Sequence, residues 1–305
     1  MSRPRGPRSA WGLVPLVTAL AGCVGAADLP GSVSISPSVL CAASLPPGDV
    51  ERVAEGFSNG TRGIAFSPDG RLFVTHGDAI EEVLTDGSHG ALATVPGAAG
   101  MEWWSGQLAV ATPEAGGDGG LVRVDVATGE TVLFVSPLPG AESATLTPWR
   151  TLAVASPTAD QEVVEVLNDG GLDGFIQEVP APFGVAFTPE GDAAWVSSSS
   201  AEAPTLWRFP IVEDGIVRGD PFLEWDAPVG AAEAVVSTTD DAVYVALSAA
   251  GRIARVDPET AEETDVGTEL VAPTGIALGT GDWDPCALYV TSPSSDAVFA
   301  VGVSR

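Results

Sequence analysis

The stretch Gly63-Ile-Ala-Phe-Ser-Pro-Asp-Gly-Arg-Leu-Phe-Val-Thr75 decides the fold. It holds two short apolar segments, Gly63 to Phe66 and Arg71 to Thr75, separated by Ser67-Pro68-Asp69-Gly70, which has the composition of a tight turn. Apolar segments this short, without a 3.6-residue period, indicate strands and not a helix. The stretch therefore predicts an antiparallel pair of strands that begins at a small residue.

The same unit recurs along the chain. Its copies begin at Gly63-Ile-Ala-Phe66, Gly100-Met-Glu-Trp103, Ser143-Ala-Thr-Leu146, Gly184-Val-Ala-Phe187, Glu233-Ala-Val-Val236 and Gly275-Ile-Ala-Leu278. Successive copies start 37, 43, 41, 49 and 42 residues apart, which is the period of a four-stranded propeller blade. No segment has a helical apolar period of useful length. The sequence predicts an all-β fold, a six-bladed β-propeller with four-stranded blades.

The last copy is one strand short. It contains strands at Ala287 to Thr291 and Ala297 to Val301, and the sequence then ends at Arg305. The segment Asp49 to Ala54 precedes the first copy as Phe175 to Val179 precedes the fourth. We therefore expect Asp49 to Ala54 to be the outermost strand of blade six, because a ring closed in this way leaves no free sheet edge.

The first residues have the order of an export signal. Arg3, Arg5 and Arg8 come first, an apolar run from Trp11 to Leu20 follows, and small residues precede Cys23. The apolar run is too short to cross a bilayer as a helix, which needs about 20 residues. We expect residues 1–22 to be a cleavable signal peptide.

The segment Leu20-Ala21-Gly22-Cys23 resembles the lipobox of bacterial lipoproteins. This resemblance implies lipid on Cys23 and attachment to a membrane; the alternative is ordinary secretion, with Cys23 incidental. Residues 23–48 are rich in Ser, Pro and Ala and suit a tether, so residues 49–305 would form the propeller. Val24, where Asp is absent, favours the outer membrane, with the protein in the periplasm or at the cell surface.

Two cysteines remain in a compartment where disulfides persist, Cys41 and Cys286. Cys286 lies at the start of the second strand of blade six, and Cys41 lies eight residues before the closing strand. Both positions fall on the bottom face of the same blade. We predict a Cys41–Cys286 disulfide, against the alternative of two free buried thiols.

The charge of the chain excludes one class of partner. The formal net charge is −28, and without the three signal arginines 10 basic residues face 41 acidic ones, or −31. Nucleic acid is excluded as a partner, because binding phosphates requires a basic surface. Self-repulsion that keeps the protein soluble explains the acidity, and a dedicated cation-binding role is the alternative.

The repeats resemble a known family. The Gly63 to Thr75 segment is similar to a blade of the gluconolactonase/regucalcin-like and NHL-type propellers, and Ala287 to Phe299 is similar to a YVTN-type repeat. The resemblance implies a divalent cation, calcium or similar, at the top of the channel and hydrolysis of lactones. Its Asn ligands would stand just before inner strands, where this chain has Arg62, Phe183 and Thr274. We therefore do not expect the family's metal site to be retained.

Candidate site residues come from the loops expected at the top of the channel. Arg62 is the one cation placed at the channel mouth, and Glu102, Glu142 and Glu233 are expected at the tops of inner strands. The candidate ligand-binding residues are Asn59, Arg62, His76, Glu102, Glu142, Phe183 and Glu233. They form either a polar funnel for a small ligand or cation, or a set of ion pairs that plugs the channel. His76 and His89 are expected to lie far apart.

Two functions fit these observations. The leading hypothesis is a membrane-anchored binding or scaffold module, without enzymatic activity, for an unknown protein or small-molecule ligand. The alternative is a metal-dependent lactone hydrolase with displaced ligands. The sequence contains no glycine-rich phosphate-binding loop that leads from a strand into a helix.

Overall fold

The computed structural model describes residues 45–303, apart from 114–117, 158–161, 201–202, 214, 227–231 and 238–241. By its contacts the chain divides into Met1–Ile35 and Ser36–Arg305, and every described residue belongs to the second unit. The predicted signal peptide 1–22, Cys23 and Cys41 lie outside the described residues. Within the described part, no helix has the length and apolar character needed to cross a membrane.

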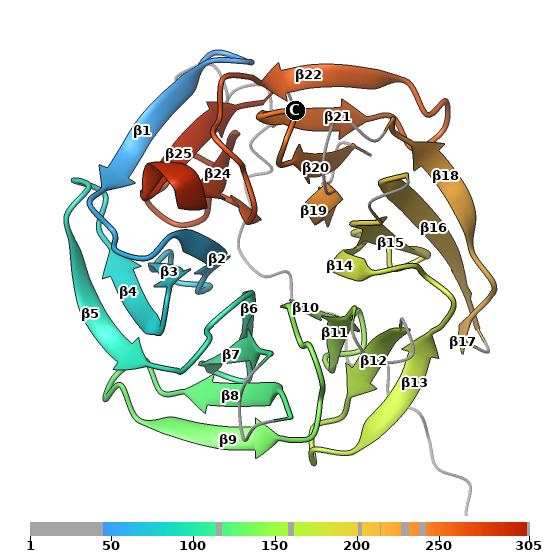
Figure 1. Cartoon of the computed structure of the whole chain (residues 1–305), viewed down its shortest axis with the longest axis horizontal. Coiled ribbons are helices and arrows are strands. Elements are labelled where there is room, and N and C mark those ends of the chain that lie inside the picture. The colour runs from blue at the N-terminus through green and yellow to red at the C-terminus, as the bar shows by residue number, and fades with distance from the viewer. Residues whose placement is uncertain are drawn as a thin grey trace, which may run out of the picture. The chain divides into compact units, whose positions relative to one another are not determined.

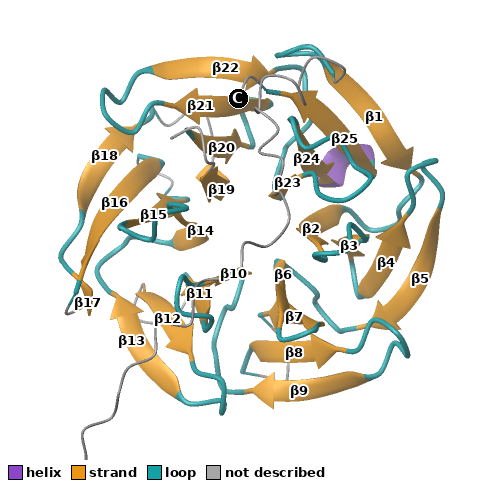
Figure 2. Ribbon diagram, turned by 180° about the vertical axis from the view of Figure 1, so that it is seen from behind, coloured by secondary structure: helices purple, strands orange, loops and turns teal. Residues whose placement is uncertain are grey.

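The described residues form six antiparallel sheets arranged as blades around a central channel (Figures 1 and 2). Blade 1 contains β2 (Thr61–Phe66), β3 (Leu72–His76), β4 (Ala79–Val83) and β5 (His89–Thr94). Blade 2 contains β6 (Met101–Trp104), β7 (Gln107–Thr112), β8 (Gly120–Val124) and β9 (Thr131–Val135). Blade 3 contains β10 (Ser143–Leu146), β11 (Leu152–Ser156), β12 (Glu162–Val166) and β13 (Leu172–Ile176).

The other three blades follow the same plan. Blade 4 contains β14 (Pro182–Phe187), β15 (Ala193–Ser198), β16 (Thr205–Val212) and β18 (Asp220–Glu224), with the short β17 (Gly215–Ile216) paired to the end of β16. Blade 5 contains β19 (Ala232–Ser237), β20 (Val243–Leu247), β21 (Arg252–Val256) and β22 (Glu263–Gly267). Blade 6 contains β23 (Ile276–Leu278), β24 (Ala287–Ser292), β25 (Ala297–Gly302) and β1 (Val50–Glu55), and the 3-10 helix η4 (Pro293–Ser295) connects β24 to β25.

The predicted closure of the ring is confirmed. β1 pairs with β25 in antiparallel register, with Val50 opposite Val301 and Glu55 opposite Ala297. The residues just before β1 also bond to blade 6: the Gly48 amide donates to the Gly302 carbonyl at 2.9 Å. The two ends of the described chain therefore share one sheet. Its core includes Ala54 from β1 and Val298 from β25.

Cys286 lies directly before β24, as predicted, and is buried and disulfide-bonded. The Leu45 amide donates to Asp284 Oδ2 at 3.1 Å, so the first described residues lie beside the loop that carries Cys286. The predicted partner, Cys41, is outside the described residues. The Cys41–Cys286 pairing therefore stays a prediction.

The small residue that opens each repeat has a steric reason. Neighbouring inner strands approach so closely that a Cβ on Gly63 would lie 2.2 Å from the Ala99 carbonyl oxygen, and one on Gly275 would lie 2.4 Å from that of Arg62. Both distances are far inside van der Waals contact. Only glycine or another small residue allows neighbouring blades to pack at these points.

Hydroxyl groups from the second strands join neighbouring blades at this level. Thr75 Oγ1 accepts a hydrogen bond from the Gly63 amide at 2.7 Å and donates to the Ala99 carbonyl of blade 2 at 2.8 Å. Thr291 makes the same pair of bonds from blade 6, with its donation to the Arg62 carbonyl at 2.6 Å. We call this arrangement the hydroxyl clamp; it satisfies buried backbone groups that no sheet ladder pairs.

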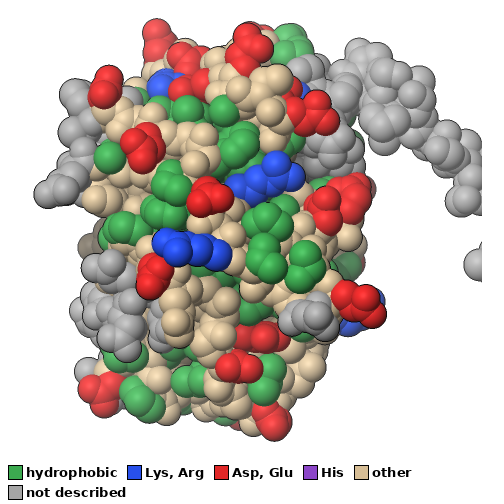
Figure 3. Space-filling model, turned by 90° about the vertical axis from the view of Figure 1, so that its right-hand side faces the viewer, with side chains coloured by type: hydrophobic (Ala, Val, Ile, Leu, Met, Phe, Trp, Pro, Cys, Tyr) green, Lys and Arg blue, Asp and Glu red, His purple; other side chains and the backbone are tan. Residues whose placement is uncertain are grey.

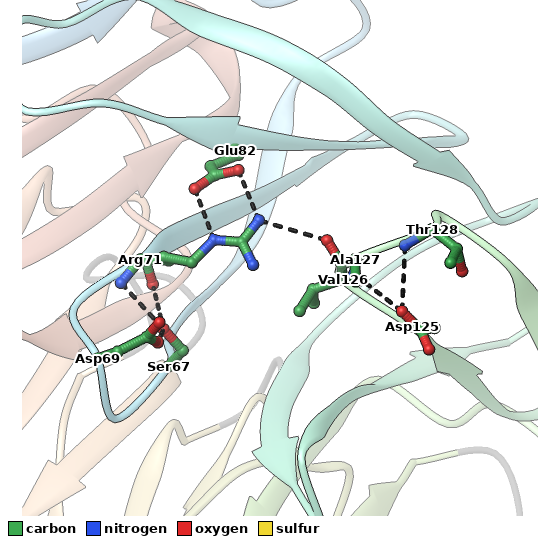
Figure 4. A network of polar contacts seen from close by, with 8 residues as sticks. All are labelled: Ser67, Asp69, Arg71, Glu82, Asp125, Val126, Ala127 and Thr128. Atoms are coloured by element: carbon green, nitrogen blue, oxygen red, sulfur yellow. Dashed lines mark hydrogen bonds and ion pairs between the residues drawn. The ribbon is translucent and has the colours of Figure 1, made fainter.

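Blades 1 and 2 are also joined at the other end of the inner strands (Figure 4). Arg71 donates two hydrogen bonds of 2.7 Å to the Glu82 carboxylate within blade 1 and one of 3.3 Å to the Val126 carbonyl of blade 2. Its guanidinium also lies 5.0 Å from the centre of the Phe73 ring. This bidentate pair serves packing between blades and lies outside the cavity described below.

Replacing Thr75 with valine tests the hydroxyl clamp. Thr75 is fully buried, and valine keeps its shape while leaving the Gly63 amide and the Ala99 carbonyl without this partner. We expect Thr75→Val to lower the free energy of unfolding by about 2 kcal/mol, measured by urea denaturation. The control is Thr131→Val at an exposed residue of β9, which should change stability by less than about 0.5 kcal/mol. Equal effects of the two substitutions would contradict the clamp.

Candidate functional site: the channel mouth

The strand registers define a ring of six equivalent positions at the mouth, the end of the channel where the inner strands begin. The first and second strands of every blade pair in an equivalent register. Ile64 lies opposite Val74 in blade 1, for example, and Val235 lies opposite Val245 in blade 5. Counting two residues back from these aligned positions gives one residue per blade. The ring consists of Arg62, Ala99, Glu142, Phe183, Glu233 and Thr274.

The register corrects one predicted repeat start. Ala234, and not Glu233, is the residue in blade 5 that corresponds to Gly63 of blade 1. Glu233 therefore corresponds to Arg62, one position earlier, and belongs to the ring. Neither Ala99 nor this alignment of Glu233 was apparent from the sequence, because alanine carries no chemical signal and blade 5 has Ala234 where blades 1, 2, 4 and 6 have glycine.

All six ring residues line a cavity of about 370 Å³ that runs down between the inner strands. Below the ring the lining is mainly apolar, with Ile64, Val185 and Ile276 from blades 1, 4 and 6. A volume of this size lies within the range of small-molecule sites. A mainly apolar lining with a few polar groups, here the ring charges and Glu102 in the shaft, is also their usual composition.

Arg62 and Glu142 form an ion pair across the ring. Arg62 Nη2 donates to Glu142 Oε2 at 3.0 Å, and the two residues come from blades 1 and 3, on either side of Ala99. The Glu142 side chain is 16% exposed and that of Arg62 41%. Burial raises the pKa of Glu142, and the positive charge and hydrogen bond of Arg62 partly offset this rise. The pair therefore fills one side of the mouth.

Glu233 lies in the other half of the ring. Burial raises the pKa of its carboxyl, while a hydrogen bond from Ser248 and the charge of Arg62 lower it and the charge of Glu142 raises it. With one arginine and two glutamates, the ionised ring has a net charge of −1. The predicted residues Arg62, Glu142 and Glu233 thus do meet at one place.

The predicted position of Glu102 was wrong. In the register it corresponds to Ala65, three residues below the ring position of its own blade, so it lines the shaft and not the mouth. Burial raises the pKa of Glu102 to about 7, despite hydrogen bonds from the Trp103 amide, from Leu146 and from Thr145. Thr145 and Leu146 belong to the inner strand of blade 3, so Glu102 reaches across to the next blade.

The expectation that the two histidines lie far apart was also wrong. His76 Nε2 lies 3.2 Å from Glu81 Oε1, and His89 Nδ1 contacts Glu81 Oε2. Glu81 lies opposite Val74 on β3 and opposite Ala91 on β5. Each histidine is therefore its diagonal neighbour on one face of the sheet, within reach of a long side chain. The order of the strands along the sequence had suggested that the two histidines lie at opposite ends of the blade. Both side chains nevertheless reach Glu81, which is diagonal to each of them.

This histidine cluster serves the closure of the ring. His76 Nδ1 donates to the Ser58 carbonyl at 2.7 Å, and His89 Nε2 lies 3.1 Å from the Glu55 carbonyl oxygen. The Phe57 ring stacks on His89 with 4.3 Å between ring centres. Both histidines thus hold the segment that links β1 to β2. Since His76 does not line the cavity, we do not count it as a residue of the mouth.

Asn59 is likewise outside the cavity. It has a left-handed backbone, with φ of 66°, and packs against Gly77. Across the described residues, no group of three or more His, Cys, Asp or Glu side chains is arranged to hold a metal ion. Arg62, Phe183 and Thr274 do occupy ring positions, so the side chains found there are a cation, an aromatic ring and a hydroxyl.

Comparison with solved structures establishes the fold. A gluconolactonase from Xanthomonas campestris superposes with a TM-score of 0.71 at 13% sequence identity, covering 84% of this chain and 89% of that one. The calcium-binding protein regucalcin from Agrobacterium tumefaciens gives a TM-score of 0.70 at 17% identity, with coverage of 83% and 92%. The chain has the fold of a six-bladed β-propeller and resembles these two structures in fold.

The same fold occurs with other chemistry. An aldose sugar dehydrogenase from Streptomyces coelicolor, solved with bound PQQ, has a TM-score of 0.68 at 16% identity and covers 85% of this chain and 100% of its own. No protein-family profile and no curated protein sequence matches the chain. Because the similar structures differ in activity, the function has to be argued from the site.

The charge outside the channel shows no single focus on the side seen in Figure 3, where acidic side chains are scattered among apolar ones. Dispersed acidity of this kind suits solubility. It also gives the whole protein, at −28, a field that attracts cations. The mouth is distinguished from the rest of the surface by the cavity that its charges surround and not by their number.

The raised pKa of Glu102 predicts a pH-dependent stability. Its value of about 7 in the folded protein lies above the ordinary 4.5, so folding favours the protonated form. This contribution is complete at low pH and is lost as the pH rises through 7. Between about pH 5 and pH 8 the free energy of unfolding should fall by at most about 3 kcal/mol, and Glu102→Gln should remove that part of the fall in denaturation curves.

Glu82→Gln provides a control of opposite sign. The hydrogen bonds of Arg71 lower the pKa of Glu82, so its contribution is present at neutral pH and is lost in acid. This substitution should therefore destabilise the protein at neutral pH and have little effect at low pH. The interpretation of Glu102 would be refuted if Glu102→Gln left the slope between pH 5 and pH 8 unchanged.

Proposed function

We propose that this chain is a lipid-anchored, extracytoplasmic binding protein and that the channel mouth is its ligand site. The observation that carries the proposal is the ring, where Arg62, Glu142 and Glu233 surround the opening of a 370 Å³ cavity with an apolar shaft. Charged side chains are costly to bury. Three of them around one opening point to recognition of a polar group on a ligand whose apolar part enters the shaft.

The attachment of the chain supports outward presentation of the mouth. Leu45 bonds to Asp284, in the loop between β23 and β24 at the end of the inner strand opposite the ring. A random chain as long as the sequence between Cys23 and Leu45 would have a root-mean-square end-to-end distance of about 25 Å. With lipid on Cys23, the face opposite the mouth can lie toward the membrane and the mouth can lie toward the surroundings.

Lactone hydrolysis has less support. The family's activity needs a divalent cation that polarises a carbonyl and activates water, and hard cations bind through several oxygen ligands. Two of the three positions where an amide ligand would be expected carry Arg62 and Phe183, neither of which supplies an oxygen. We therefore favour binding over catalysis, with the small-molecule ligand as the partner and no cofactor required.

Cys23→Ser tests the membrane anchor. We expect the wild-type chain to incorporate a labelled fatty acid and to partition into the membrane fraction, because two or more acyl chains hold a protein stably. Cys23→Ser should lose the label and move to the soluble fraction. The control is Cys41→Ser, which should keep both properties. Retention of Cys23→Ser in the membrane fraction would disprove lipid anchoring at this residue.

Arg62→Met tests the mouth as the ligand site. We would screen the full-length protein, purified from membranes in detergent, against a library of small metabolites by ligand-observed NMR. At least one ligand should bind at least about 10-fold more weakly to Arg62→Met, because the unpaired Glu142 would then change the charge of the mouth. The control is Arg150→Met, an exposed residue at the other end of the inner strands.

Two results would contradict the proposal. The first is that every bound ligand has the same affinity for wild type and Arg62→Met. The second is hydrolysis of aldonolactones that depends on added divalent metal and is lost on replacing Glu142 or Glu233 with alanine, which would establish the hydrolase instead.

A further inference from the structure

The two halves of the ring differ in a way that bears on the ligand. On one side Arg62 and Glu142, at the two ring positions that flank Ala99, form an ion pair. On the other side lie Phe183, Glu233 and Thr274, in consecutive blades. Because the charges of Arg62 and Glu142 neutralise each other, the first half of the ring attracts a charged ligand only weakly. The second half determines which group the mouth can bind.

Glu233 is the charge of the mouth without an ion-pair partner. In the described part of the chain, no basic side chain lies within ion-pair distance of its carboxylate. It accepts a hydrogen bond from Ser248, which orients the carboxylate and leaves its charge in place. A partly buried carboxylate of this kind favours a cationic partner, because burial without one costs solvation energy.

Phe183 supplies an aromatic ring at the position of the mouth next to that of Glu233. The chain has 10 phenylalanines, and all lie within the described residues. Nine of them contact another aromatic ring or an arginine. Phe183 makes no such contact with any residue that the structure describes, although it lines the mouth. The face of an aromatic ring attracts a cation electrostatically, and most strongly where water is excluded.

We propose that the mouth binds a small organic cation, with an amine or quaternary ammonium group held between the Phe183 ring and the Glu233 carboxylate. This proposal rests on the proposed function and specifies its ligand class. The apolar part of the ligand would enter the shaft beside Val185 and Ile276. The net charge of the chain, −28, would attract such a ligand before contact.

Other ligand classes fit the mouth less well. An anion would have to displace Glu142 from Arg62, because Arg62 is the only basic residue of the ring. A metal ion would require several converging oxygen ligands, and Phe183, at the ring position next to Glu233, supplies no side-chain oxygen. An organic ammonium ion needs a single carboxylate and an aromatic face, and the ring provides both.

The test compares two ligands that differ in charge and have the same shape, choline and 3,3-dimethylbutan-1-ol. Their affinities for the full-length protein in detergent would be measured by ligand-observed NMR and isothermal titration calorimetry. We expect choline to bind at least about 10-fold more tightly than the neutral alcohol. Glu233→Gln and Phe183→Leu should each weaken choline binding by at least about 5-fold and leave the affinity for the alcohol almost unchanged.

Glu259→Gln is the matched control, because it removes one exposed carboxylate outside the channel and alters the net charge as Glu233→Gln does. It should leave choline binding unchanged. Circular dichroism would establish that each variant is folded, and Glu233→Asp, which keeps the charge, should retain part of the affinity. Equal weakening by Glu233→Gln and Glu259→Gln would show general attraction to an acidic protein and overturn the proposal.

The remaining outcomes separate this proposal from the proposed function. If choline binds no better than the alcohol while another compound binds in a manner that depends on Arg62, the mouth is a ligand site but the cation proposal is wrong. If no compound binds in a manner that depends on any ring residue, both are wrong.

Discussion

The close approach of neighbouring inner strands is the constraint on which the rest of the propeller depends. At Gly63 and Gly275 the backbone of one blade touches the carbonyl of the next, and even a Cβ would overlap it. This contact makes the channel narrow and leaves buried backbone groups that no sheet ladder can pair. The hydroxyls of Thr75 and Thr291 pair them. The contacts that pack neighbouring blades closely are therefore also the places where buried backbone groups find hydrogen-bond partners.

This arrangement also explains how a rigid scaffold can carry a variable site. The carbonyls of Arg62, Ala99, Glu142 and Phe183 each accept a hydrogen bond from the preceding blade. Their backbones are thereby fixed, while their side chains project into the mouth. Substitution at these ring positions changes the charge and shape of the opening without disturbing the blade contacts one residue further along. A common fold with different activities among similar structures is the expected result.

Several polar groups that suggested chemistry have structural roles instead. The second strand ends with a hydroxyl that donates to a loop carbonyl in blades 2, 3, 4 and 6, and in blade 1 His76 Nδ1 makes the corresponding bond to Ser58. His76 thus replaces a serine or threonine in a bond that fixes the entry to the inner strand. The Arg71–Glu82 pair similarly joins blades. These groups differ from those of the mouth in position, because none of them lines the cavity.

The sequence by itself determined the number of blades, the inner strand of each and the closure by β1, because these depend on local apolar patterns and turn residues repeated at a near-constant spacing. It also identified Arg62, Glu142, Phe183 and Glu233 as candidates. Only the tertiary structure decided which candidates meet. Glu102 moved from the mouth to the shaft because strand register sets depth in the channel, and His76 joined His89 because Glu81 lies diagonally between them. Both outcomes depend on pairings between strands, which no single segment of the sequence specifies.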